Sequence, residues 1–227
     1  KNAGVTVIMN LADTAEEAAK YEGFADTYYA GQKVIYLGLG VDFEAADFKA
    51  GLAKGLKFFA ENEGTYLIHC TEGKDRAGFV SALLECLMGA TYDEVVEDYM
   101  VTYYNYYGVE EGTEKYAAIA NSNIIKSLQK AFGVEDLSKA DLAAEAKEYI
   151  LSLGLTEEEV TNLMVNLGLE IAEEPEDTKP EDTKPEDTKP EGGNGPADTS
   201  DPIVIWAGMA IFSLCGAAVM GKKKEEF

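Results

Sequence analysis

Hydrophobic and polar positions in the first ninety residues follow two patterns. Short, nearly continuous apolar runs predict buried β-strands over 5–11, 33–38 and 65–68. Between and after these runs, apolar side chains recur every three or four residues, which predicts helices over 45–60 and 78–88. Strands that alternate with helices in this order are typical of an α/β fold with a parallel sheet flanked by helices.

After Gly89 the helical pattern continues without further strands. The spacing predicts helices over about 92–106, 112–131, 138–153 and 156–167. Helix starts are marked by Thr–Glu pairs with capping-box spacing: Thr14 with Glu17, Thr91 with Glu94, and Thr156 with Glu159. We therefore expect a helical extension attached to the α/β core rather than an obviously separate domain.

The composition changes sharply at Pro175. The sequence PEDTK occurs three times in succession, and such a polar, proline-containing segment predicts an extended, disordered spacer. The run 203–220 carries no charge and is followed by three lysines. A length near 20 apolar residues predicts a transmembrane helix, and the lysines place its C-terminal end inside; the alternative is a buried core helix. The predicted domains are the α/β core (1–107), the helical extension (108–172), the spacer (173–202), the transmembrane anchor (203–221) and a short cytoplasmic tail (222–227).

The formal net charge of −23 argues against nucleic acid as a partner, because no basic stripe is available to neutralise phosphates. Three cysteines, Cys70, Cys86 and Cys215, form no disulfide framework. We interpret Cys86 as a packing residue of its predicted helix. The chain lacks a starting Met and runs almost directly into a strand, which suggests a truncated N-terminus.

Candidate chemistry is concentrated in residues 69–78, HCTEGKDRAG, between a predicted strand and a predicted helix. Arg76 and His69 are the only arginine and histidine of the chain, and both accompany Cys70. A loop of backbone N–H groups at a helix N-terminus stabilises a thiolate and binds a phosphate dianion. An arginine adds two parallel donors that a lysine cannot supply. The segment therefore predicts covalent phosphoryl transfer to Cys70; the structural alternative is a buried cysteine with an incidental arginine nearby.

This loop resembles the signature loop of the tyrosine and dual-specificity phosphatase superfamily. Its GKDR core is similar to a bacterial branch that acts on phosphotyrosine and, in some members, on phosphoinositides. The resemblance covers about residues 4–107. It implies a Cys70 nucleophile, an Arg76 clamp and a supporting His69. The implied phosphate-binding residues are Thr71, Glu72, Gly73, Lys74, Asp75 and Ala77, with Lys74 adding charge that suits multiply phosphorylated head groups. No metal or cofactor is expected.

The leaving group needs a proton from a positioned carboxylic acid. Asp75 lies in the loop, and the resemblance assigns the matching aspartate an acid role. Asp42 resembles the mobile-loop aspartate of dual-specificity members and precedes Cys70 at a plausible spacing. Each also has a structural alternative: Asp75 as a brace of the loop and Asp42 as a helix cap. Both remain candidates.

Two features favour other interpretations of parts of the chain. The family commonly places Ser or Thr after the arginine, and Ala77 at that position predicts slow hydrolysis of the intermediate. It also supports a rival function, a phosphate-binding protein without turnover; a persulfide sulfurtransferase is disfavoured because it has no need of Arg76. Tyrosines crowd residues 99–107, either as a pocket wall or, preferably, as helix packing with an amphipathic rim.

The tail resembles the surface-anchoring signals of Gram-positive bacteria: a spacer, a polar motif at 195–201, an apolar stretch and a basic end. The polar motif departs from sortase spacing, so membrane anchoring is the expectation and wall attachment an alternative. Together the sequence predicts a cell-surface phosphatase that takes a phosphotyrosine protein or a phosphoinositide as substrate.

Overall fold

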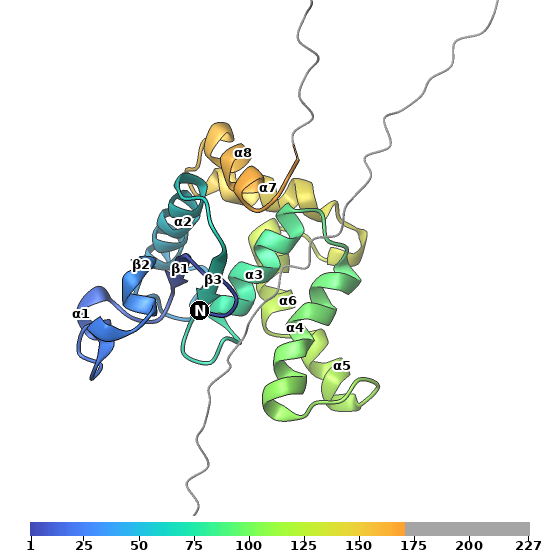
Figure 1. The fold of residues 1–227 in the computed structure, drawn as a ribbon. Coiled ribbons are helices and arrows are strands. Elements are labelled where there is room, and N and C mark those ends of the chain that lie inside the picture. Colours follow the sequence, from blue (N-terminus) through green and yellow to red (C-terminus); the bar gives the residue numbers. More distant parts are fainter. Residues whose placement is uncertain (171–227) are drawn as a thin grey trace, which may run out of the picture. The chain divides into compact units, whose positions relative to one another are not determined.

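The three predicted strands form one parallel sheet. The computed structural model describes residues 1–170, and in that part of the chain β1 (Val7–Asn10), β2 (Lys33–Tyr36) and β3 (Tyr66–His69) pair in the order β2-β1-β3 (Figure 1). Both pairings are parallel and in register, with Asn10 opposite Tyr36 and His69. The predicted α/β fold is confirmed. The carboxyl ends of the strands meet at one edge, where the chain leaves β3 for the candidate loop.

Helices fill the remainder of the described chain. Short 3₁₀ turns cover Phe24–Asp26, Tyr29–Gly31 and Leu137–Lys139. The α-helices are α1 (Ala15–Ala18), α2 (Ala46–Glu61), α3 (Arg76–Leu87), α4 (Tyr92–Tyr107), α5 (Glu114–Ala120), α6 (Ile124–Phe132), α7 (Leu142–Ser152) and α8 (Glu157–Asn166). All three predicted capping boxes are formed, at the starts of α1, α4 and α8.

Some helix boundaries differ from the predictions. The single helix predicted over 112–131 is wrong, because the chain breaks between α5 and α6, where Asn123 takes a positive φ of 46°. The segment predicted as a helix from residue 138 begins instead with a 3₁₀ turn. There the Asp141 side chain accepts a hydrogen bond from the Ala144 N–H and starts α7. Helix α3 begins at Arg76 rather than at Gly78, so the arginine lies in its first turn.

The helical extension packs directly on the α/β core. Helix α8 lies against α2 and α7 lies against α3. The Asn166 amide donates to the carbonyls of Phe59 and Ala60, both at 2.9 Å, near the C-terminal end of α2, where the Phe59 carbonyl also accepts from the Asn62 N–H at 3.4 Å. Residues up to Leu169 belong to one unit by their contacts. Helices far from the loop in sequence therefore contribute to its surroundings.

The predicted spacer and tail begin after the described part of the chain. The spacer repeats, the predicted anchor at 203–221 and the tail all lie outside residues 1–170. Within residues 1–170, no helix is long and apolar enough to cross a membrane.

Candidate active site

The candidate loop, residues 70–75, joins the carboxyl end of β3 to the first turn of α3. Gly73 is buried there with φ at +73°, a conformation that L-residues with a side chain rarely adopt. A glycine is thus needed for the chain to turn back into the helix. The loop places Cys70 at the strand end, where it is half-buried, and Arg76 at the helix start.

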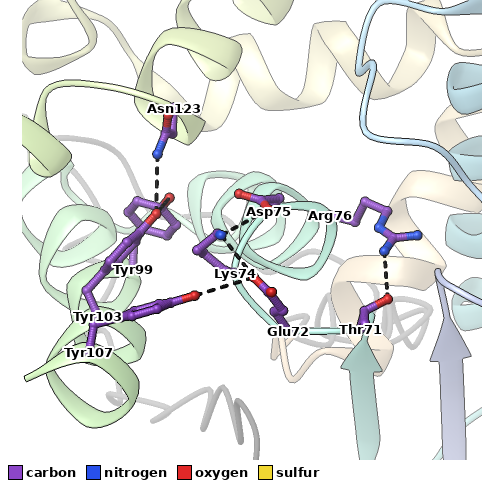
Figure 2. Close-up of polar contacts among 9 residues, drawn as sticks. All are labelled: Thr71, Glu72, Lys74, Asp75, Arg76, Tyr99, Tyr103, Tyr107 and Asn123. Carbon is purple, nitrogen blue, oxygen red and sulfur yellow. Dashed lines mark hydrogen bonds and ion pairs between the residues drawn. The ribbon is translucent and has the colours of Figure 1, made fainter.

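The Arg76 guanidinium is anchored by backbone and loop acceptors. One terminal nitrogen donates to the Leu39 carbonyl at 2.7 Å, and the other donates to Thr71 Oγ1 at 3.0 Å. Figure 2 shows Arg76 reaching Thr71 on one side of the loop, with Lys74 on the other. The remaining Nε–H is buried and has no hydrogen-bond partner among the described residues. A buried donor without a partner costs free energy, so this N–H is suited to an incoming oxygen acceptor.

Lys74 does not extend freely into solvent. Its ammonium lies 3.0 Å from Glu72 Oε2 and 3.5 Å from Asp75 Oδ2. It also lies 5.8 Å from the centre of the Tyr107 ring, and the Tyr107 hydroxyl donates to Glu72 at 3.4 Å. The hydrogen bond and charge of Lys74 lower the pKa of Glu72 below its ordinary value. Helix α4 thereby contacts Glu72 and Lys74 of the loop through Tyr107.

His69 has structural partners on both sides of its ring. Nε2 lies 2.7 Å from the Tyr29 hydroxyl, and Nδ1 lies 3.4 Å from the Cys70 carbonyl oxygen. Burial lowers the pKa of His69 below its ordinary value, so the ring is neutral near pH 7. These contacts fit the expected supporting role. No motif in the sequence indicates Tyr29, which comes from a 3₁₀ turn 40 residues upstream.

A cleft of about 510 Å³ adjoins the loop, and both candidate acids line it. Asp75 enters from the start of α3 and Asp42 from the segment between β2 and α2. Phe43 stacks on Phe79 of α3 with ring centroids 4.7 Å apart, which fixes the neighbouring Asp42 beside the loop. Asp42 accepts a hydrogen bond from the Glu44 N–H, and α2 starts at Ala46 with Ala45 as its N-cap and no side-chain cap. The capping alternative for Asp42 is therefore wrong.

The cleft wall includes residues that the sequence did not single out. Cys70 and Arg76 are not among the lining residues, and the cleft meets the loop through Asp75. Further polar and aromatic members come from α2, from α6 with its N-cap, and from α7: Lys49, Asn123, Ser127, Lys130, Tyr149 and Ser152. No spacing in the sequence links these positions, because three separate helices bring them together.

The crowded tyrosines of α4 divide between packing and surface. Tyr99 and Tyr103 are buried, and their hydroxyls lie 3.0 Å apart. Asn123 donates to the Tyr103 hydroxyl at 3.3 Å, as Figure 2 shows. A side chain at Gly78 would approach the Tyr99 ring to 3.0 Å, so glycine allows α3 and α4 to meet closely. Packing is thus confirmed for these two tyrosines, whereas Tyr107 and its neighbours form an exposed rim.

Cys86 lies inside α3, fully buried among apolar side chains. Burial raises the pKa of this thiol to about 12. A thiol that stays protonated near neutral pH is a poor nucleophile. The interpretation of Cys86 as a packing residue agrees with these surroundings.

Comparison with known proteins finds a family model that covers most of the described chain. A model of the tyrosine phosphatase family matches residues 5–167, well over half of the sequence. A tyrosine-protein phosphatase from Nostoc commune is 25% identical over 131 residues, which cover 48% of this chain and 41% of that protein. The chain therefore spans less than half the length of this relative. The matched region includes the loop, the cleft and all eight α-helices of the described residues.

Proposed function

Since this chain belongs to the tyrosine phosphatase family, we propose that it hydrolyses phosphate monoesters through a phosphocysteine on Cys70. Phosphotyrosine in a protein or peptide is the first substrate to test, and a phosphoinositide head group is the second. The loop resembles that of phosphatases that act on phosphotyrosine and, in some members, on phosphoinositides. The predicted anchor at 203–221 would present the domain at the cell surface, which is a separate proposal.

One observation carries the proposal more than any other. Arg76 lies at the helix end of the loop that begins with Cys70, its guanidinium is held by Leu39 and Thr71, and its buried Nε–H has no acceptor in the described residues. A phosphate oxygen bound in the loop would satisfy that donor. The second terminal nitrogen, now on Thr71, would supply the parallel donor of a bidentate contact.

The proposed reaction has two steps. The Cys70 thiolate attacks phosphorus, a sulfur–phosphorus bond forms, and the bond to the leaving oxygen breaks as that oxygen takes a proton from an aspartic acid. Water then attacks phosphorus and gives its proton to the same carboxylate. The sulfur–phosphorus bond breaks, which releases inorganic phosphate and restores the thiolate. Arg76 and the backbone N–H groups of the loop would stabilise the charge on the equatorial oxygens in both steps.

Asp42 and Asp75 both remain candidates for the acid, because both line the cleft beside the loop. Asp42 is exposed, while Asp75 shares Lys74 with Glu72. We favour neither on these contacts alone. Kinetics can separate the two, since a good leaving group needs little protonation.

The test compares p-nitrophenyl phosphate, which has a good leaving group, with phenyl phosphate, which has a poor one. Wild-type protein should release phosphate from both, and Cys70→Ser from neither. Replacement of the true acid by asparagine should slow phenyl phosphate hydrolysis by about 10²-fold or more, and p-nitrophenyl phosphate hydrolysis much less. The other aspartate variant is then the matched control. Absence of release by wild type, or unchanged release by Cys70→Ser, contradicts the proposal.

The second candidate function is phosphate binding without turnover. Ala77 favours it, because the hydroxyl that the family commonly places after the arginine is absent, and Ala77 is buried. A pure binder would hold phosphate yet never form the phosphocysteine. Trapping that intermediate distinguishes the two functions.

A further inference from the structure

We propose that Glu72 restricts this site to substrates with a single phosphate group, by holding Lys74 in an internal ion pair. The inference rests on the proposed function and names its substrate class. A second phosphate next to the reacting one would find the lysine already neutralised. An isolated phosphate monoester, such as a phosphotyrosine side chain, would not need it.

The contacts of Lys74 fix its ammonium in one place. Glu72 Oε2 lies at 3.0 Å and Asp75 Oδ2 at 3.5 Å, while the Tyr107 ring covers it at 5.8 Å (Figure 2). The lysine side chain is only 22% exposed, whereas that of Glu72 is 49% exposed. The lysine is therefore the enclosed partner and the glutamate its outer cover.

Tyr107 strengthens this cover from outside the loop. Its hydroxyl donates to the same Glu72 oxygen that accepts from Lys74, at 3.4 Å. Two donors on one oxygen orient the carboxylate toward the lysine. Helix α4 thus fixes a pair that two neighbouring loop residues alone would hold loosely.

The charges of this group oppose a second phosphate. Two carboxylates surround one ammonium, so Glu72, Asp75 and Lys74 together carry a net charge of −1. A phosphate dianion that approached Lys74 would meet this negative field and would have to displace Glu72. The first phosphate is served by Arg76 and the loop backbone, which do not depend on Lys74.

Removal of the Glu72 charge is the direct test. In the full chain carrying Cys70→Ser, calorimetry would compare the binding of myo-inositol 3-phosphate and myo-inositol 3,4-bisphosphate, which differ by one phosphate. Glu72→Gln should raise the affinity for the bisphosphate, relative to the monophosphate, by at least about fivefold, or ~1 kcal/mol. Adding Lys74→Met should remove that gain, because the lysine would be its source.

Glu63→Gln is the matched control. Glu63 is exposed and lies before β3, at the opposite edge of the sheet from the loop, so its replacement changes net charge equally. It should leave the affinity ratio unchanged. Equal gains for both ligands, a gain that survives Lys74→Met, or no binding of either ligand by any variant would overturn the inference.

A turnover experiment separates this inference from the proposed function. With Cys70 present, Glu72→Gln should shift the ratio of kcat/KM for the same two substrates in the same direction. A shift in binding without any turnover means that the catalytic proposal fails and the inference stands. Turnover with an unchanged ratio of kcat/KM means that the catalytic proposal stands and the inference about Glu72 fails.

Discussion

A carboxyl pair between α3 and α4, formed by the buried Glu85 and the half-buried Asp98, makes folding stability depend on pH. Glu85 of α3 is 7% exposed, and one of its carboxyl oxygens has no hydrogen-bond partner in the described residues. Burial, and then the charge of Asp98 on α4, raise the pKa of Glu85 to about 9. Ser81, Tyr99 and Thr102 complete its surroundings and bring no positive charge. Glu85 is therefore protonated in the folded protein near neutral pH.

The sign of the effect follows from proton binding. Between the ordinary pKa of a glutamic acid and about 9, the folded state holds a proton at Glu85 that the unfolded chain has lost. Stability from this group is fully present below the ordinary pKa and falls as pH rises toward the folded pKa. The slope is about 1.4 kcal/mol per pH unit, so stability falls by about 3 kcal/mol between about pH 6 and about pH 8.

Glu85→Gln removes the titration and keeps the size of the side chain. Urea unfolding followed by far-ultraviolet circular dichroism gives the unfolding free energy of both proteins at each pH. The wild-type value should fall by about 3 kcal/mol more than the variant value over that window, because the titrations of groups that do not interact with Glu85 cancel between the two proteins. Asp98→Asn should reduce the difference without abolishing it, since burial is the larger cause. Parallel curves for wild type and Glu85→Gln would refute the reasoning.

Three further changes have expected outcomes. Ala77→Ser should raise the steady-state rate about fivefold and shrink the initial burst, because a hydroxyl worth about 1 kcal/mol would help the thiolate leave; stopped-flow release of nitrophenol measures both. Asn166→Ala should lower the unfolding free energy by about 1–3 kcal/mol, because the Ala60 carbonyl loses the Asn166 donor and the Phe59 carbonyl keeps only the longer hydrogen bond from the Asn62 N–H, at 3.4 Å; urea unfolding measures this change, and an unchanged midpoint would contradict it. Tyr29→Phe should lower the unfolding free energy by a similar ~1–3 kcal/mol, because His69 Nε2 loses its hydrogen-bond partner; the same urea unfolding assay measures this change.

Local signals in the sequence predicted much of the fold. The strand runs, the capping boxes and the loop between strand and helix all depend on neighbouring residues, and the structure has each of them. The break before α6 was missed because Asn123 adopts a positive φ that neither glycine nor proline marks. A positive φ is uncommon in residues other than glycine, and asparagine is one of the residue types that adopt it most often.

The site was predictable only where its residues lie in one segment. The loop from Cys70 to Arg76 is contiguous, so its pattern is visible, and the family it indicated is confirmed. The partners of that loop are remote in sequence. The Leu39 carbonyl accepts a hydrogen bond from Arg76, and Tyr107 contacts Lys74 and Glu72. Lys74 and Glu72 are close in sequence, so their ion pair could be anticipated. The contact of Tyr107 in α4 with Glu72 could not, because no periodic pattern in the sequence predicts it.

The proposed reaction requires that the Cys70 thiolate attacks phosphorus and forms a phosphocysteine. The most direct measurement is mass spectrometry of the protein quenched with acid while it turns over p-nitrophenyl phosphate. We predict one phosphate on the peptide that contains Cys70 and none in Cys70→Ser. Slow hydrolysis of the phosphocysteine, expected because Ala77 lacks a hydroxyl, should favour its accumulation. Continued phosphate release by Cys70→Ser would contradict the account.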